Sequence, residues 1–485
     1  MGSVAWMRTS ITAIVFLLTA ASWAIGQAAT SNPSSVAASA PASQPASRAT
    51  SQAASKPAGA AAAAGPVSTL PPWAKTIKNP VPWFNWGFDE RLRNEYLLNS
   101  TLDSKAPGHD TDYNRYRSRL WWTVKPIEDM EFNFRLTWEF RNYFAPESKA
   151  EQVTNLSDAI FDTMNIKWKN VMGLPLTVTA GRQDINLGNG WLVFEGTPDD
   201  GSRTLFFDGF RATYEIKEIQ TTIDAMYVWQ NPRENQYITP FAYKPATILT
   251  EQTENGAILY VTNKSIKNTE INGYFIYKDD SDPLKAPLGD SGQIYAFGNR
   301  LVHDFNKNWQ YRGEWVEEVG NKNGDNFSAG GVNNLLTYYF RDPLDNRLRT
   351  GYEFLSDNFD PLWGRWPQWS EIANPIWAME ANGRPAYWRN MHRIQFGHTI
   401  APIKNLTFAT DYHLLFADAN PMAGSSGFSD DGRFRGQLIT WAARYKINDF
   451  FSTAFLAEGF IPGNYYTAPK EDTAVFLRYE FIFTF

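Results

Sequence analysis

The sequence predicts an all-β fold: a transmembrane antiparallel β-barrel of about 18 strands, preceded by a disordered N-terminal tether. Three observations support this prediction. Apolar and polar residues alternate over segments of about 10 to 14 residues, the links between these segments are alternately short and long, and the chain is aromatic yet polar. Aromatic residues make up 15% of 485 residues, whereas the mean hydropathy is -0.41. This combination is typical of rings at the two edges of a membrane.

The N-terminal part is predicted to direct export and then to remain unfolded. Residues 11–26 are apolar, follow Arg8 and end in small residues, so we assign residues 1–26 to a signal peptide that is removed. Residues 27–75 are assigned to an Ala/Ser/Pro-rich periplasmic linker. Its stretch 28–68 has no apolar residue larger than Val and cannot bury a core. No later stretch offers about 20 consecutive apolar residues, which excludes a helical membrane protein.

Residues 83–485 are assigned to the barrel. The segments 84–96, 113–125 and 130–141 show the alternation most clearly, with apolar side chains on one face and polar or charged side chains on the other. Segments of this length exceed the usual strand of a soluble sheet and suit a tilted membrane span.

The links between strands predict how the barrel is oriented. Short links are expected at residues 126–129, 170–173, 217–218, 264–267, 305–308, 342–346, 402–405 and 446–449. Longer polar links are expected at residues 99–112, 145–155, 186–201, 231–251, 279–291, 320–326, 358–387, 418–432 and 462–472. Brief periplasmic turns and long outer loops produce this rhythm, and a Greek-key sandwich does not. An even number of strands places both ends of the barrel on the periplasmic side.

The last strand, AVFLRYEFIFTF at residues 474–485, is expected to close the barrel by pairing with the first strand. Its aromatic face would then contact outer-membrane lipid. A terminal strand with alternating aromatic residues also resembles the signal that the outer-membrane assembly machinery reads. The residues of that signal would be Tyr479, Phe481, Phe483 and Phe485.

Arginines are the main chemical feature of the predicted barrel. Arg115, Arg117 and Arg119 project from one face of a strand at intervals of about 7 Å. The other candidates for the solute path outside the family motifs below are Arg91, Arg93, Arg135, Arg389 and Arg393, and Arg141 also follows on the next strand. Such guanidinium groups would hold the carboxylates of an anionic saccharide. The alternative is that they pair with Asp89, Glu95, Glu131 and Glu139 and only stiffen the wall.

Other kinds of chemistry find little support. The chain has no cysteine and five scattered histidines, so no metal and no cofactor is expected, and no catalytic residue is assigned. There is no G-x-S-x-G or H-E-x-x-H motif, which argues against an enzyme. A net charge of -6 disfavours nucleic acid as a partner.

Two stretches resemble the alginate export family of outer-membrane barrels. The first, residues 179–214, contains Gly181-Arg182-Gln183 and Phe207-Asp208-Gly209-Phe210-Arg211, and the second is LRTGYEFLSDNFDPLWGRWPQW at residues 348–369. The resemblance implies a monomeric barrel whose electropositive constriction passes an anionic polyuronate, with Arg182 and Arg211 as the matching basic positions.

The leading hypothesis is therefore an outer-membrane channel for a polar, anionic polysaccharide or oligosaccharide, with an arginine-lined lumen and long loops that gate its outer mouth. Three alternatives remain open at this point. They are a porin for general or other solutes, a barrel enzyme, and a secreted carbohydrate-binding β protein.

Overall fold

The computed structural model describes residues 70–149, 152–154, 159–195, 206–232, 250–283, 289–364, 367–380 and 388–485. The predicted signal peptide and most of the predicted linker lie outside the described residues. The last residues assigned to the linker begin a short helix, α2 (Pro72–Lys78), which starts at a proline whose fixed φ suits a first helical turn.

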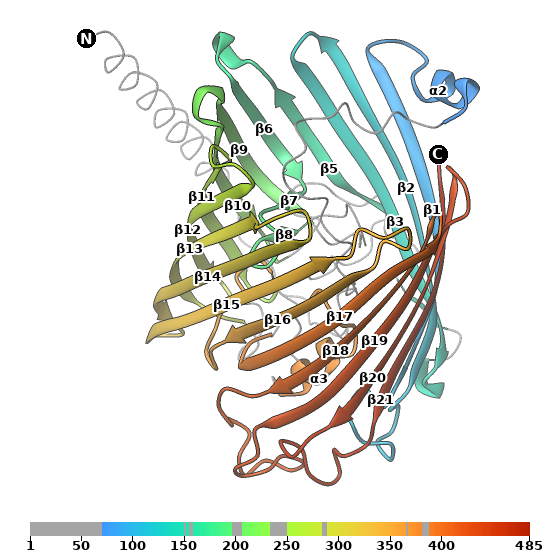
Figure 1. The fold of residues 1–485 in the computed structure, drawn as a ribbon, viewed down its shortest axis with the longest axis vertical. Coiled ribbons are helices and arrows are strands. Elements are labelled where there is room, and N and C mark those ends of the chain that lie inside the picture. The colour runs from blue at the N-terminus through green and yellow to red at the C-terminus, as the bar shows by residue number, and fades with distance from the viewer. Residues whose placement is uncertain are drawn as a thin grey trace, which may run out of the picture. The chain divides into compact units, whose positions relative to one another are not determined.

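The chain forms a closed antiparallel barrel, as predicted (Figure 1). Its eighteen wall strands are β1 (Phe84–Leu98), β2 (Thr111–Ile127), β3 (Met130–Ala145), β5 (Ala159–Trp168), β6 (Leu176–Gln183), β9 (Phe207–Ile216), β10 (Thr221–Gln230), β11 (Thr253–Asn263), β12 (Thr269–Ser281), β13 (Gly292–Asp304), β14 (Trp309–Lys322), β15 (Asp325–Tyr339), β16 (Arg347–Leu355), β17 (Met391–Ile403), β18 (Leu406–Phe416), β19 (Phe434–Lys446), β20 (Phe451–Pro462) and β21 (Ala474–Thr484). The described residues also form β4 (Val153–Thr154), β7 (Ile185–Asn186), β8 (Phe194–Glu195) and α3 (Ala373–Glu380). β1 pairs with both β2 and β21, which closes the sheet.

The links alternate between short and long as predicted, with one exception. Residues 320–326 were expected to form a long outer link, but β14 and β15 are joined by Asn323 and Gly324 alone. Both residues have positive φ, 55° and 91°. An Asn-Gly pair adopts these angles readily and favours a two-residue hairpin, so the expectation of a long link was wrong.

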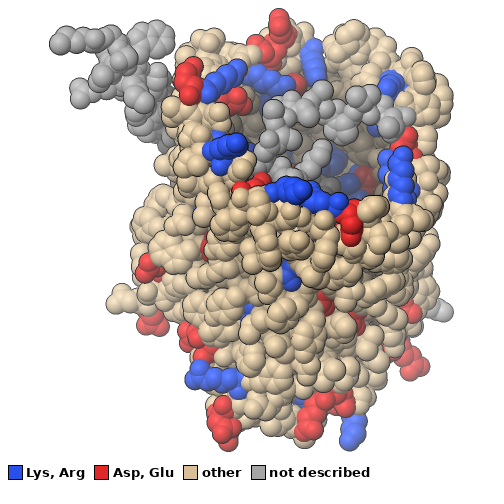
Figure 2. Space-filling model, viewed as in Figure 1, with Lys and Arg blue, Asp and Glu red and all other residues tan. Residues whose placement is uncertain are grey.

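The two faces of the wall differ as the alternation predicts. Leu92 and Leu120 are 46% and 39% exposed, whereas Arg91 and Arg93, which flank Leu92, are 2% and 3% exposed. We call the exposed apolar face the outer face and the opposite one the inner face. Figure 2 shows an outer surface that is mostly uncharged in its middle, with many of its Lys, Arg, Asp and Glu side chains toward the two ends. No helix of the described residues is long and apolar enough to cross a membrane.

The C-terminal strand pairs with the first strand as expected, but its last residue is not open to lipid. Tyr479 is 54% exposed, whereas Phe485 is only 8% exposed. The Phe485 ring lies 5.6 Å from that of Phe88 and 6.2 Å from that of Trp73 in α2. Its backbone exchanges two 2.8 Å hydrogen bonds with Phe88. The expectation that the aromatic face of this strand contacts lipid is therefore wrong for Phe485, because α2 contributes a ring beside it.

Candidate functional site

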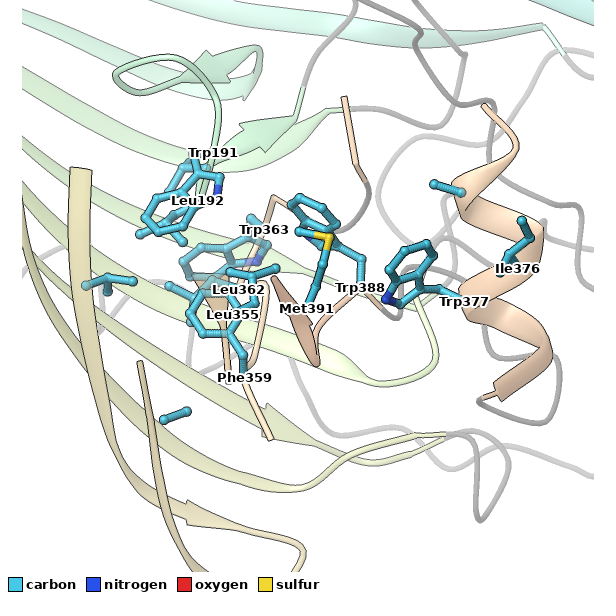
Figure 3. Packing of buried hydrophobic residues seen from close by; sticks show 14 of the residues in the cluster. Trp191, Leu192, Leu355, Phe359, Leu362, Trp363, Ile376, Trp377, Trp388 and Met391 are labelled. Atoms are coloured by element: carbon cyan, nitrogen blue, oxygen red, sulfur yellow. The ribbon is translucent and has the colours of Figure 1, made fainter. Parts of the chain in front are cut away.

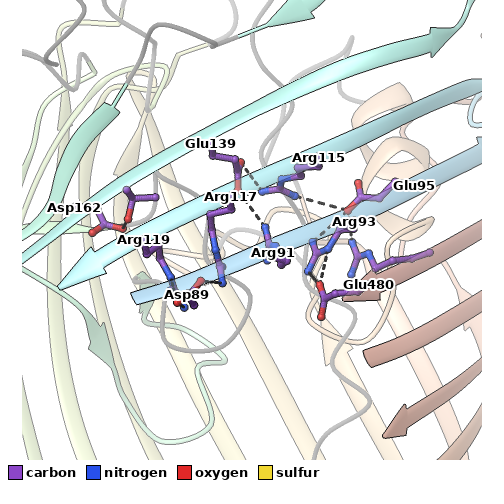
Figure 4. A network of polar contacts seen from close by, with 12 residues as sticks. Asp89, Arg91, Arg93, Glu95, Arg115, Arg117, Arg119, Glu139, Asp162 and Glu480 are labelled. Atoms are coloured by element: carbon purple, nitrogen blue, oxygen red, sulfur yellow. Dashed lines mark hydrogen bonds and ion pairs between the residues drawn. The ribbon is translucent and has the colours of Figure 1, made fainter. Parts of the chain in front are cut away.

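The predicted arginine candidates of the first strands lie on the inner face in a dense charge network (Figure 4). The network consists of Arg91, Arg93, Arg115, Arg117, Arg119 and Arg478 with Asp89, Glu95, Glu139, Glu371 and Glu480. Asp89 accepts hydrogen bonds from Arg117 at 3.0 Å and from Arg119 at 2.7 Å. Glu139 forms ion pairs with Arg91 at 3.1 Å and Arg115 at 2.8 Å. Each of these two carboxylates contacts two guanidinium groups, and these contacts offset the free-energy cost of burying the charges.

These ion pairs agree with the alternative hypothesis, in which the arginines pair with carboxylates of the wall and stiffen it. Three of the four carboxylates named for it, Asp89, Glu95 and Glu139, take part. Glu131 does not, since it binds Lys169 at 2.6 Å near the short-turn end. Sequence reasoning missed Glu371 and Glu480 because they lie far along the chain. Barrel closure brings Glu480 to Arg93, whose Nε donates to it at 2.7 Å.

Two further candidates, Arg135 and Arg393, are paired as well. Arg135 binds Asp162 at 2.7 Å and Asp184 at 2.9 Å. Arg393 donates to Glu353 at 2.6 Å, and its guanidinium carbon lies 4.7 Å from the ring centre of Trp369. Arg389 lies in the link before β17, where its backbone oxygen accepts a hydrogen bond from the indole of Trp377 at 2.8 Å.

The first family-like stretch supplies two strands that pair with each other. Arg182 in β6 lies directly opposite Asp208 in β9 and donates to its two oxygens at 2.9 and 3.0 Å. The glycines beside them are required by close contacts. A Cβ on Gly181, whose φ is +117°, would lie 2.4 Å from the Met164 oxygen, and one on Gly209 would lie 2.3 Å from the Tyr227 oxygen. The G-R-Q and F-D-G residues therefore lie opposite each other where β6 pairs with β9.

Arg182 and Arg211 occupy opposite faces of the wall. Successive side chains alternate along β9, so Asp208 and Arg211 point to different sides, and Arg182 shares the side of Asp208. Arg211 shares its face with the buried Asp224, to which its Nε donates at 2.8 Å. Arg182 is 2% exposed, packed under the ring of Phe206 at 3.9 Å. Of the two positions, Arg211 is thus the one on the inner face.

The links that follow the family-like strands fold into the barrel and pack against each other (Figure 3). Val193 and Trp363 form an isolated bridge, in which Trp363 N donates to Leu192 O at 3.0 Å. The rings of Trp191 and Phe359 stack with centres 6.2 Å apart. Residues of both family-like stretches therefore meet in one apolar cluster inside the wall.

Charged contacts fix the second of these links to the wall. Asp360 contacts Lys322 at 2.6 Å and Lys278 at 3.6 Å, and its backbone N–H donates to Glu318 at 3.0 Å. Burial alone would raise the pKa of the Asp360 carboxyl, but the two ammonium groups hold it below its usual value. Further along, Ser370 Oγ donates to Glu458 at 2.7 Å just before α3. These contacts attach the link to β12, β14 and β20.

A pocket lies where the two inward links meet the wall. It encloses about 490 Å³ of empty space, part of it open to solvent. The two links contribute Asn189, Trp191, Gln368, Trp369 and Trp388, and the wall contributes Arg312, Glu314, Asn333, Glu353 and Arg393. Within the described parts of the chain, the guanidinium of Arg312 forms neither a hydrogen bond nor an ion pair.

Sequence reasoning named only Arg393 of these pocket residues as a site candidate, although five others lie within the two family-like stretches: Asn189, Trp191, Glu353, Gln368 and Trp369. The signal for Arg312 was present, because Gln310, Arg312 and Glu314 alternate with Trp309, Tyr311 and Trp315 in β14. The tryptophans of the two links carry no such period. Their convergence depends on how the links fold, and a local pattern does not encode it.

The comparisons with known proteins agree with this geometry. A family model described as alginate export matches residues 82–478. The chain belongs to the alginate export family. This confirms the resemblance that the two stretches indicated. Among proteins with a curated description, none matches the sequence.

Solved structures share the barrel fold at low sequence identity. Pseudomonas aeruginosa OpdQ is 11% identical, with 83% of this chain and 97% of that chain covered and a TM-score of 0.53. Acinetobacter baumannii OccAB4 is 10% identical, covering 84% and 100%, also with a TM-score of 0.53. Pseudomonas aeruginosa OccK8 (OprE) is 12% identical, covering 82% and 98%, with a TM-score of 0.51. Together with the family, the fold makes this alginate export family member an outer-membrane channel.

The arrangement of the side chains also bears on whether the channel could bind a metal ion. Within the described ranges, no group of three or more His, Asp and Glu side chains is placed to hold a metal ion.

Proposed function

We propose that this outer-membrane channel passes a polar, anionic polysaccharide or oligosaccharide along an arginine-lined lumen, as a monomer and without catalysis of its own. Membership in the alginate export family carries the proposal, because the barrel fold alone suits many solutes. The arginines of the inner face support it. One guanidinium group can bind two carboxylates at once, as Arg93 does with Glu95 and Glu480, so a carboxylate of a passing chain can be bound without releasing those of the wall.

The proposal extends to export and assembly. We assign residues 1–26 to a removed signal peptide and residues 27–75 to a periplasmic linker, and we infer that the aromatic terminal strand is read by the assembly machinery. Outer-membrane fractionation and heat-modifiable gel migration test the location. Recovery of the protein in the soluble secreted fraction would contradict it and favour a carbohydrate-binding β protein.

Channel recordings test the solute. The purified protein, inserted into planar lipid bilayers, is exposed to an alginate oligosaccharide and to a neutral dextran of similar length. We expect the anionic oligosaccharide to interrupt the current at lower concentration, and reversal potentials across a KCl gradient to show anion preference. Equal interruption by both saccharides together with cation preference would instead favour a porin for other solutes.

A further inference from the structure

The pocket between the inward links and β14–β17 contains an arginine without an ionic partner among the described residues, whereas the arginines of the charge network are paired with carboxylates. We propose that it holds one carboxylated sugar ring, with the carboxylate on the guanidinium of Arg312. This inference rests on the proposed function, since it assigns a holding point within the same lumen.

Arg312 is the first reason. It is half-buried and lines the pocket, and among the residues that the structure describes its guanidinium forms no hydrogen bond or ion pair. The two nearby carboxylates are engaged by other groups. Glu353 accepts from Arg393 at 2.6 Å and from the Trp191 indole at 2.7 Å, and Glu314 accepts from the Tyr274 hydroxyl at 3.2 Å. The five N–H groups of Arg312 therefore remain for a ligand, and a planar carboxylate matches them in pairs.

Further unused polar groups surround Arg312. The indole Nε1 of Trp369 is buried without a hydrogen-bond partner. The amide of Asn333, which lies directly opposite Glu314 in the β14–β15 register, forms no hydrogen bond within the described residues. A buried donor without a partner costs free energy, so a ligand with several oxygens would relieve that cost. The hydroxyls of a sugar supply such oxygens.

The aromatic lining explains why a ring is favoured over a small inorganic anion. Trp191, Trp369 and Trp388 all border the pocket, and flat indole surfaces suit the C–H faces of a pyranose. Trp369 is itself held by neighbours, with the ring of His413 5.1 Å and that of Trp388 5.9 Å away. The pocket is thus built before any ligand arrives.

Direct binding of two matched sugars tests the proposal. Glucuronate and glucose share a ring and differ at one carbon, which carries a carboxylate in the first. Calorimetric titration of the full-length protein in detergent is expected to show tighter binding of glucuronate. Arg312→Gln should weaken glucuronate binding by about tenfold or more and leave glucose unchanged, because it removes the ionic hydrogen bonds alone. Arg312→Lys keeps the charge without the paired donors and should retain part of the affinity.

Arg347→Gln is the matched control. Arg347 lies on the same face of β16 as Glu353, pairs with Asp345 and does not line the pocket. Equal weakening by Arg312→Gln and Arg347→Gln, or equal affinity of the wild type for both sugars, would overturn the pocket. Heat-modifiable migration confirms that each variant is folded. Bilayer recordings on the same samples separate the two proposals, since anion-preferring current with no effect of Arg312→Gln on glucuronate refutes the pocket alone.

Discussion

The pairing of Asp89 with two arginines predicts a large cost when both arginines are neutralised. Asp89 is 2% exposed and accepts from Arg117 at 3.0 Å and Arg119 at 2.7 Å. The double variant Arg117→Gln/Arg119→Gln keeps side-chain length but leaves a buried carboxylate without either cation. Breaking a buried ion pair by removing one side costs about 3–5 kcal/mol, and we expect the free energy of unfolding to fall by that order.

The measurement is urea unfolding of the protein in phospholipid vesicles, followed by tryptophan fluorescence and by gel migration. Adding Asp89→Asn to the double variant should restore most of the lost stability, because it removes the unpaired charge. Arg347→Gln is the control, since its partner Asp345 is half exposed and a surface pair contributes less than about 1 kcal/mol.

Two results would refute this reasoning. If the double variant unfolds at the urea concentration of the wild type while its anion preference falls, these arginines act on solute and not on Asp89. If the triple variant stays as unstable as the double variant, the loss does not come from the unpaired carboxylate.

Four further outcomes are expected. Arg182→Lys cannot bind both oxygens of Asp208, so it should lower the unfolding midpoint in the same urea assay, whereas unchanged stability would show that the paired geometry is unimportant. Phe485→Asp should leave protein in the periplasm, and normal outer-membrane levels would argue against its assembly role. The pKa of the Asp360 carboxyl is lowered, so the stability that its ion pairs give to the link is present at neutral pH and weakens as the pH falls below the ordinary pKa of 3.8. Proteolysis of this link should therefore increase at low pH, and Asp360→Asn should remove this acid dependence. Removing residues 31–65 should leave conductance unchanged, and a loss of barrel stability would reveal a docked element.

Local pattern was sufficient for the wall. The alternation of residues 130–141 predicts a strand, and β3 spans Met130–Ala145 with the same two faces. The Asn323-Gly324 turn shows how a correct rhythm can still mislead, because its local turn chemistry favours a hairpin over the long link that the rhythm suggests.

The site could be predicted only in part, because its partners come from distant segments. Arg93 was recognisable as a charged inner residue, but its contact with Glu480 spans 387 positions and exists only once β21 closes on β1. Likewise, nothing in the composition of residues 356–380 indicates that Asp360 binds Lys322 in β14. Such contacts follow from register and closure, which a one-dimensional pattern leaves undetermined.

The wall and the pocket should contribute to selectivity in ways that salt can separate. The field of the charge network acts over distance and is screened over about 10 Å at 0.1 M salt, so any anion preference it gives should fade as the salt concentration rises. Contact between a sugar carboxylate and Arg312 is short-range and partly shielded from solvent, so it should weaken less over the same range. If the wall alone selects solute, glucuronate binding and anion preference will fall together with salt. If Arg312 also acts, glucuronate binding will persist at concentrations where the reversal potential has already lost its preference.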